Sequence, residues 1–386
     1  IRNQLNIDVP IRAIFDRPVL HDFAKYLESL VGQEQLVFHA IKPRPLQYAG
    51  EAPLSLNQEA FLWLSKKMKL KENVFNIPLI LKINGNLHID QLELACREII
   101  MRHETFRTTF SAGKDGSIRQ IVSPHHNFNL SVINDYKNLA KISQAKAIQG
   151  AIDHRIGISC DIETGPLLNF TLFVLDENRF LLLMVFHNVI FDGWTFDRFL
   201  EELGAILSSH QNNELMNLPE VAVQYADYAW WQRNCLDAGF KEDQKVFWID
   251  YLKDAPHDLA LPFDYLRQEH HDYQGACFNL NISSELVSKL RAYTEPNRFT
   301  VFAVLFGVFA SLLYCYTEQF DIIVGTSVAN RQVQGLEKLM GLVMSNIAVR
   351  FKFNQSTSFE SVVKDIITFT STNQKYQSIP LEQIMN

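Results

Sequence analysis

The stretch Met184–Trp194, MVFHNVIFDGW, decides how the rest of the chain is interpreted. It begins inside an apolar run, and its polar residues come at His187, Asn188 and Asp192. A polar patch directly after a buried strand is typical of sites in α/β folds. Gly193 favours a turn whose backbone conformation is closed to other residues, and the Asp192 carboxylate is suited to orienting a base or holding an arginine.

The segments on both sides of this stretch alternate between strand and helix patterns. In the first half of the chain, apolar runs and helical periods predict strands at 75–83, 168–175 and 180–186 and helices at 90–100 and 195–207. In the second half they predict helical structure at 286–316, strands at 321–325 and 344–353, and a helix at 359–374. The alternation indicates an α/β body in two successive halves.

Length and composition limit the class of protein. The chain has 386 residues, of which 47% are hydrophobic and 20% charged, as expected for a globular protein of two or three domains. Its net charge of −7 disfavours a nucleic-acid backbone as the main partner. Neither phosphate-loop nor dinucleotide glycine motifs are present. No signal-peptide pattern is visible, so we expect a cytoplasmic protein.

Three further features have simple interpretations. The five cysteines are scattered without CxxC spacing, which favours buried thiols in a reducing compartment. Residues 299–316 carry no charge, but the run is short for a membrane span, so we expect a fully buried helix and no membrane contact. The cluster Glu269–Asp272 is expected to be a solvated loop rather than a metal site, because adjacent residues rarely point at one ion.

Six ordered motifs together resemble one family. The central stretch resembles the HHxxxDG motif of the condensation domains of non-ribosomal peptide synthetases, which are acyltransferases of the chloramphenicol acetyltransferase type. The other five matches are RHETFRTTF (102–110) to RHExLRTxF, YADYAWWQR (225–233) to YxDYAxWQR, GTSVANR (325–331) to GTPxAxR, GLVMSN (341–346) to GxFVNT and YQSIPLE (376–382) to QDVPFE. They cover about residues 54–386.

The resemblance implies a domain organisation. Residues 1–31 look like the C-terminal helices of a peptidyl carrier domain without its modified serine, and the linker-like 32–53 follows. Residues 54–220 and 221–386 would be the two acetyltransferase-like lobes of a V-shaped pseudo-dimer, with the second lobe incomplete at its C-terminus. The expected fold class is therefore α/β with a short α-helical remnant in front.

The resemblance also implies a reaction and its partners. A condensation domain joins a donor acyl or peptidyl thioester to the amine of an aminoacyl acceptor, both held on phosphopantetheine arms of carrier domains. It needs no metal or soluble cofactor of its own. Expected partners are an upstream donor carrier, a downstream acceptor carrier and an adjacent adenylation domain.

The site residues implied by the motifs fall into three groups. The catalytic group is Asn188, at the position of the family's catalytic second histidine, with His187 and Gly193. Asp192, Arg331 and Trp194 are expected to hold the site together, with Arg331 as the ion-pair partner of Asp192. Gln58, Ser345 and Asn346 are expected to line a substrate tunnel.

Asn188 departs from the family at the residue tied to catalysis. Asparagine donates and accepts hydrogen bonds but does not titrate near neutral pH, whereas imidazole does. Whether the chain is an active enzyme therefore stays open. Asn188 is interpreted as an introduced substitution that inactivates the domain, as a natural residue of a silent domain, or as a residue with which the domain still works.

Two function classes remain, and a third is weaker. The first is a condensation domain impaired or inactivated by Asn188. The second is a catalytically silent, condensation-like scaffold that recruits or spaces partner modules. A stand-alone acyltransferase that uses acyl-CoA fits the HxxxDG core, but the carrier-like residues 1–31 count against it.

Overall fold

A strand that is buried on both faces carries the central motif into the interior of the protein. The computed structural model describes residues 19–30, 41–68, 71–113, 116–137, 139–212, 218–235, 241–265, 278–373 and 376–384. Its contacts divide the chain into two compact units. Unit 1 comprises Ile1–His39, Gln244–Val328 and Asn346–Leu381, and unit 2 comprises Ala40–Asp243, Ala329–Ser345 and Glu382–Asn386.

Unit 2 is built on a four-stranded sheet with the order β2-β7-β6-β5. Its strands are β2 (Asn76–Asn84), β5 (Ser131–Ile133), β6 (Leu168–Val174) and β7 (Arg179–His187). The β2–β7 and β6–β7 pairs are antiparallel, and the β5–β6 pair is parallel. β6 and β7 form the hairpin predicted from the sequence.

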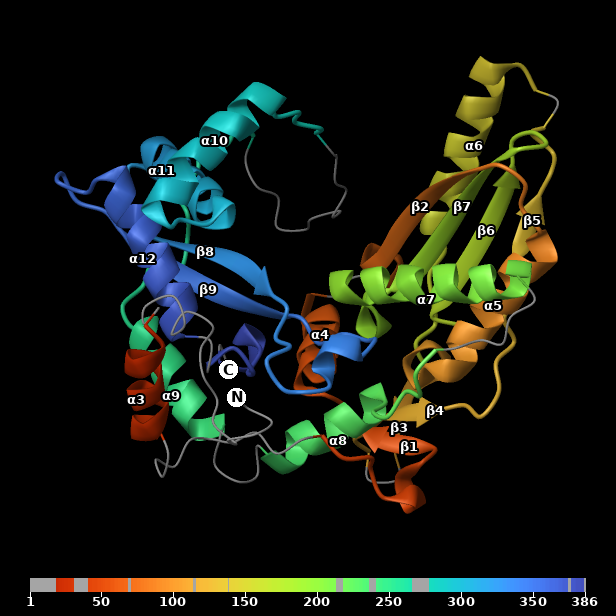
Figure 1. Cartoon of the computed structure of the whole chain (residues 1–386), viewed down its shortest axis with the longest axis horizontal. Helices are drawn as coiled ribbons and strands as arrows, with labels where there is room; N and C mark the ends of the chain where they lie inside the picture. Colours follow the sequence, from red (N-terminus) through yellow and green to blue (C-terminus); the bar gives the residue numbers. More distant parts are fainter. Residues whose placement is uncertain are drawn as a thin grey trace. The chain divides into compact units, whose positions relative to one another are not determined.

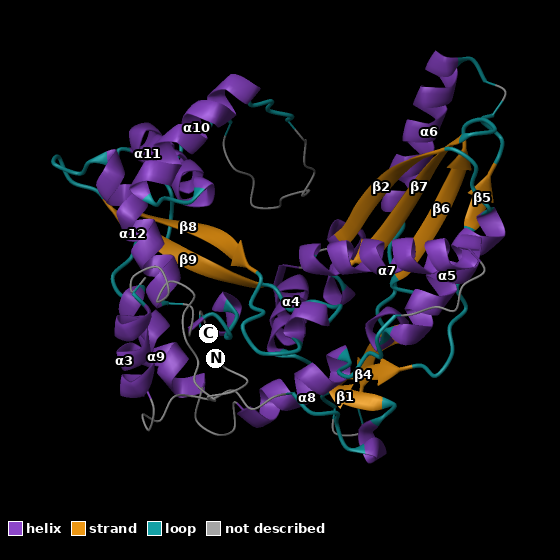
Figure 2. Cartoon of the chain, viewed as in Figure 1, coloured by secondary structure: helices purple, strands orange, loops and turns teal. Residues whose placement is uncertain are grey.

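Helices cover both faces of this sheet (Figure 2). One face packs against α5 (Ile89–Arg102) and α7 (Gly193–Asn212), and the other against α6 (Lys141–Ile156). Alternate residues of β7 point to opposite faces, so Leu182 and Met184 join the α5–α7 core while Leu183 and Val185 join the α6 core. The predicted apolar face of α5 is confirmed, since Leu92, Ala95, Cys96, Ile99 and Ile100 are all buried.

A second, three-stranded sheet lies in the same unit (Figure 1). Its order is β1-β4-β3, with antiparallel pairs of β1 (Glu51–Pro53) and β3 (Thr108–Ala112) on β4 (Ile118–Val122). The remaining elements of unit 2 are α4 (Leu56–Met68), α8 (Tyr225–Cys235) and the short helices η1 (Leu46–Tyr48), η2 (Glu72–Phe75), η3 (Glu104–Arg107), η4 (Asn188–Ile190), η6 (Leu336–Lys338) and η8 (Leu381–Gln383).

The segment 41–53, which is the described part of the expected linker 32–53, is ordered and packed on the body of unit 2. Ile41 and Arg44 are buried, and β1 belongs to a sheet. The backbone N–H of Arg44 donates to the Asp227 carboxylate, 183 residues away in the sequence. Such a partner leaves no trace in the local sequence pattern. Residues 31–40 lie outside the described residues, as do the first 18 residues of the carrier-like segment.

Unit 1 contains α3 (Leu20–Leu30), which confirms the predicted final helix of the N-terminal segment. Its other elements are α9 (Lys241–Tyr251), α10 (Ser284–Asn297), α11 (Val301–Thr317), α12 (Phe359–Thr372) and the two paired strands β8 (Asp321–Val328) and β9 (Ser345–Lys352). The division of the body at residue 220 stays a prediction. The contacts group residues 221–243 and 329–345 with the first half of the chain.

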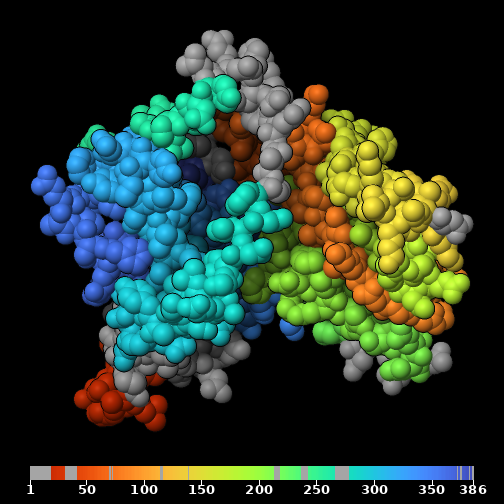
Figure 3. Space-filling view, turned by 90° about the horizontal axis from the view of Figure 1, so that it is seen from above, coloured from red at the N-terminus to blue at the C-terminus, as the bar shows by residue number. Residues whose placement is uncertain are grey.

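The prediction that residues 299–316 form a fully buried helix is wrong. α11 buries Ala303, Val304, Gly307 and Ala310, but Val308 and Leu312 on its other side are about half exposed. Part of this helix lies on the surface in Figure 3, in light blue. Among the described residues, no single helix is long and apolar enough to cross a membrane. The pair of α10 and α11, with a bend of 107° between them, is long and apolar enough when taken together.

Candidate functional site

The central motif lies where β7 ends and α7 begins. The residues of β7 from Leu182 to Phe186 are buried on both sides of the sheet, and the chain turns after them, in η4. Phe191 then folds back and stacks on Phe186 with 4.1 Å between the ring centroids. The strand and the stacked rings thus fix the turn that presents Asn188.

His187 is completely buried at the end of the strand. Its Nδ1 accepts the backbone N–H of Val189 at 3.3 Å, and the rings of Phe61 and Phe75 meet it edge-on. Burial lowers its pKa to about 4, so the imidazole is neutral at pH 7. Its protonation state is fixed and its side chain is closed to solvent, so we assign it to holding the turn rather than to contact with a substrate.

Asn188 is half-buried at the start of η4. Its backbone carbonyl accepts the N–H of Phe191 at 3.1 Å. Within the part of the chain that the structure describes, its side-chain amide makes no hydrogen bond. The amide is therefore available to a substrate as both a donor and an acceptor.

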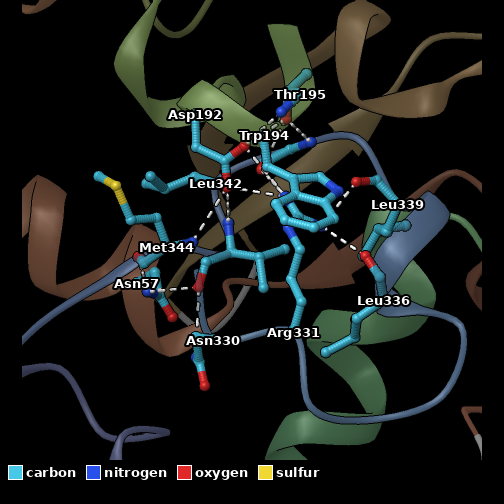
Figure 4. A network of polar contacts seen from close by, with 12 residues as sticks. Asn57, Asp192, Trp194, Thr195, Asn330, Arg331, Leu336, Leu339, Leu342 and Met344 are labelled. Carbon is cyan, nitrogen blue, oxygen red and sulfur yellow. Dashed lines mark hydrogen bonds and ion pairs between the residues drawn. The ribbon is translucent and has the colours of Figure 1, made fainter. Parts of the chain in front are cut away.

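The Asp192 carboxylate is the centre of a buried polar network (Figure 4). It accepts hydrogen bonds from the backbone N–H of Thr195 at 2.8 Å, which caps the N-terminus of α7. It also accepts the backbone N–H groups of Val343 and Met344 at 3.1 and 3.2 Å. Arg331 pairs with it at 2.9 Å, as predicted from the motif. The carboxylate therefore joins the central turn to a loop that comes about 150 residues later in the sequence.

Arg331 holds the shape of that loop, Ala329–Ser345. Its guanidinium donates to the carbonyls of Leu336 and Leu339 at 2.7 and 2.8 Å. Trp194 covers it, with the ring centroid 5.6 Å from the guanidinium carbon, and the indole N–H donates to the carbonyl of Glu337 at 2.9 Å. The packing role expected of Trp194 is consistent with these contacts.

Gly193 does not have the strained backbone expected from the sequence. It is the first residue of α7, is exposed, and its φ lies outside the left-handed region. A Cβ atom added there would meet nothing within 4 Å. The turn therefore does not require glycine, and a side chain at position 193 would occupy the open space there.

The three residues that are expected to line a substrate tunnel differ in burial, and their place in a tunnel stays a prediction. Gln58 is buried, donates to Gln120 and to the carbonyl of Val189, and accepts the N–H of Ser55. Its hydrogen bond to the carbonyl of Val189 ties α4 to the central turn. Ser345 is also buried, and its hydroxyl accepts hydrogen bonds from Asn57 and Asn330. Asn346 is exposed on β9 and accepts a hydrogen bond from Ser327.

Sequence reasoning missed two amides of this network. Asn57 donates to the carbonyl of Met344 at 2.5 Å and to the hydroxyl of Ser345 at 3.0 Å. Asn330 donates to the carbonyl of Val343 at 3.3 Å and to the same hydroxyl at 3.2 Å. Asp192 thus binds the N–H groups of residues 343 and 344, while the amides bind their carbonyls. Only Asn330 lies in one of the six motifs, and the local sequence does not show which groups either asparagine binds.

A third missed feature is the contact of Tyr225 with Gly341. The phenol donates to the carbonyl of Leu342 at 2.6 Å, and its ring fills the place of a side chain at 341. A Cβ atom on Gly341 would lie 2.1 Å from the ring, and the φ of this residue is +134°. The motif at 225–233 and the motif at 341–346 therefore meet in one close packing contact.

The described polar groups at the central turn form hydrogen bonds and one buried ion pair. Among the described residues, three or more potential metal ligands do not gather at any one place. The cluster Glu269–Asp272 lies outside the described residues. The central turn thus combines the half-buried Asn188 and the uncrowded Gly193 with the buried Asp192–Arg331 ion pair.

Comparison with known proteins agrees with the motifs. The family described as "Condensation domain" matches residues 48–386. One of the subunits of linear gramicidin synthase from Brevibacillus parabrevis is 31% identical over 388 residues, which cover 100% of this chain but only 5% of that protein. The chain thus spans a small part of this curated relative.

Two solved structures share the fold. The X-domain from teicoplanin biosynthesis is similar with a TM-score of 0.76 and 22% identity, over 90% of this chain and 75% of that one. The first condensation domain of the CDA synthetase is similar with a TM-score of 0.73 and 17% identity, over 86% and 78%.

Proposed function

This chain belongs to the condensation-domain family of the non-ribosomal peptide synthetases, and we propose that it forms a peptide bond between two carrier-bound substrates. The donor is an acyl or peptidyl thioester, and the acceptor is an aminoacyl thioester with a free amine. The observation that carries the proposal is the family match over residues 48–386, together with the polar turn at Asn188 on its buried Asp192–Arg331 support.

The reaction needs few protein groups. The acceptor nitrogen attacks the donor carbonyl carbon, the carbonyl oxygen gains negative charge, and the carbon–sulfur bond breaks as the amide forms. Hydrogen bonds to the oxygen lower the barrier, and Asn188 and the backbone N–H of Gly193 are the candidates to supply them. Because Asn188 does not exchange a proton near pH 7, we propose that turnover is about 10²–10⁴-fold below that of the histidine version.

Partners and cofactors follow from the same proposal. Thioesters are already activated, so the domain itself uses no metal or soluble cofactor, and the phosphopantetheine arms belong to its substrates. We propose an upstream donor carrier, a downstream acceptor carrier and an adjacent adenylation domain as partners. Residues 1–31 are proposed to be the end of the preceding carrier domain, and a cytoplasmic location is proposed for the whole assembly.

The test is a condensation assay with carriers loaded chemically. Donor and acceptor carriers are mixed with the chain, and the mass of the acceptor carrier is followed by intact mass spectrometry. We expect a product whose mass increases by that of the donor acyl group and that requires both carriers. Absence of product from a folded protein with competent carriers contradicts the proposal.

A second candidate function is favoured by Asn188 alone. A domain that lacks the catalytic histidine can persist as a scaffold that binds or spaces partner modules. The X-domain, one of the structures that share the fold, was also solved as a complex with OxyB. Binding of a carrier or module without product, from both Asn188 and an Asn188→His variant, would favour the scaffold.

A further inference from the structure

The chain between the carrier-like residues 1–31 and the body is folded over its second part. Proline and glycine residues break every regular period in 32–53, so its composition is that of a linker. Residues 41–53 nevertheless pack on unit 2, with Ile41 and Ala52 buried. The length of chain that tethers a preceding domain therefore depends on where the packed part begins.

Arg44 is the centre of the packed part. Its guanidinium pairs with the Asp227 carboxylate at 2.7 Å and with Glu104 at 2.9 Å, and its backbone N–H donates to Asp227 at 3.0 Å. The same guanidinium donates to the carbonyls of Tyr48 and Ala49 at 2.9 and 2.6 Å. One side chain thus binds a buried acid of α8 and also fixes the turn that contains η1.

Further contacts hold the rest of this segment. The ring centroid of Tyr48 lies 4.4 Å from that of Trp230 on α8. After it, the carbonyl of Gly50 accepts the N–H of Val122 at 2.9 Å, and β1 pairs with β4. Residues 41–53 are therefore held by buried ion pairs, a ring contact and a sheet, as parts of the body are.

We propose that residues 41–53 form a mount for the upstream carrier domain, so that the tether of this carrier ends at Ile41. The inference rests on the proposed function, in which residues 1–31 end a carrier, and adds a limit on the carrier's reach. From Leu30, the end of α3, to Ile41 the chain spans at most about 40 Å. A linker that ran on to Leu54 would span up to about 85 Å.

This limit affects which carrier delivers the donor. An attached carrier competes with free carriers at an effective concentration that falls roughly as the −3/2 power of tether length, once the tether spans the sites. A tether that ends at Ile41 keeps this concentration about 3–4-fold higher than one that ends at Leu54. The mount therefore favours the carrier on the same chain over carriers from other chains.

The experiment is a competition between an attached and a free donor carrier. The chain is produced behind a complete carrier domain whose last part is residues 1–31, and this carrier is loaded with an unlabelled donor. A free carrier with a heavy-isotope donor is added at known concentration. Intact mass spectrometry of the acceptor carrier gives the ratio of the two products. Both donors use the same site, so the ratio does not depend on how fast the reaction is with Asn188.

Two insertions of about 12 glycine and serine residues distinguish a mount from a linker that runs to Leu54. Within 31–40, the insertion lengthens the tether, and we expect the product ratio of attached to free donor to fall about 3-fold. Between the exposed Ala49 and Gly50, the insertion lies behind the mount, and we expect no change. A linker that runs to Leu54 would give about a 2-fold fall for both. Equal effects of the two insertions, or no effect within 31–40, overturn the inference.

A length series gives a second test that leaves Ala49 and Gly50 untouched. An insertion of about 24 residues within 31–40 should lower the ratio about 6-fold for a tether that ends at Ile41. For a linker that runs to Leu54 the fall would be only about 3-fold, and that result overturns the inference. Chemical denaturation of every variant checks that unit 2 keeps its stability.

The proposed function and this inference fail in different ways. If neither the attached nor the free donor yields product, with Asn188 or with Asn188→His, the proposed function fails. If product forms but its ratio does not respond to insertions within 31–40, the function stands and only the mount is rejected.

Discussion

The Asp192 carboxylate holds the candidate site together through more hydrogen bonds than Asn188, His187 or Gly193 makes. It is buried, paired with Arg331, and accepts the backbone N–H groups of Thr195 in α7 and Val343 in the loop. A buried ion pair is weak as a source of net stability, but removing one partner leaves a charge without compensation. The consequences of a change at Asp192 are therefore structural before they are chemical.

We expect Asp192→Ala to destabilise unit 2 by about 3–5 kcal/mol, because Arg331 stays buried without its partner. Chemical denaturation at pH 7.5 measures the change. Glu201→Ala is the control, since it breaks an exposed pair with Arg198 and should cost less than about 1 kcal/mol. Wild-type stability of Asp192→Ala would show that the network does not hold the turn.

A change at Gly193 should affect activity and leave stability unchanged, the reverse of a change at Asp192. A methyl group at this exposed position meets no atom within 4 Å, so Gly193→Ala should keep the melting temperature. If the donor thioester occupies the open space beside Asn188, the same methyl group should slow condensation by roughly 10–100-fold. Unchanged turnover would remove Gly193 from the site.

At the scale of elements, the loop Ala329–Ser345 is the part that assembles the site. Its carbonyls are held by Arg331, Asn57 and Asn330, and its N–H groups by Asp192. Tyr225 of α8 supports it from below Gly341. The loop is thus fixed by buried side chains from several elements rather than by regular structure of its own.

We expect Gly341→Ala to destabilise the protein by about 2–5 kcal/mol, since the methyl group collides with Tyr225 and the positive φ adds strain. Gly335→Ala in the same loop is the matched control. It also has a positive φ, of +96°, but open space around its Cβ position. It should therefore show the strain alone, about 1 kcal/mol. Similar losses in both variants would contradict the packing role of Tyr225.

The elements also show what a sequence pattern can and cannot predict. The β6–β7 hairpin and the buried face of α5 were predictable because apolar periodicity depends on neighbours along the chain. The role of Asn57 was not, because its partner Met344 is 287 residues away. The motif resemblance identified Arg331 as the partner of Asp192. Residue chemistry alone indicated that Asp192 could bind an arginine, without showing which one. α11 misled because a charge-free helix suggests burial on all sides, and only one side is buried.

In the whole molecule, one arginine, Arg44, anchors the segment 41–53 that precedes the main body. Arg44 pairs with Asp227 at 2.7 Å and with Glu104 at 2.9 Å, and it donates to the carbonyl of Ala49. The chain that follows the carrier-like helix is therefore anchored in unit 2 from Arg44 onward.

We expect Arg44→Ala to cost about 3–5 kcal/mol at pH 7.5, because the buried Asp227 and the half-buried Glu104 lose their ion-pair partner. Burial raises the pKa of Glu104, although Arg44 lowers it in part. Without Arg44 this carboxyl is protonated more readily, so the loss should shrink as the pH falls towards 5. Denaturation at the two pH values measures it, with Arg97→Ala in an exposed pair as control. A loss that is equal at both pH values would contradict the buried-charge explanation.

We propose that this chain condenses two thioester-bound substrates with an asparagine in place of the catalytic histidine. Single-turnover rates of Asn188 and Asn188→His, with the same loaded carriers at pH 7.5, test it most directly. We expect product from both proteins, formed about 10²–10⁴-fold faster with histidine. Product from neither folded protein would contradict the claim that the chain is a condensation catalyst.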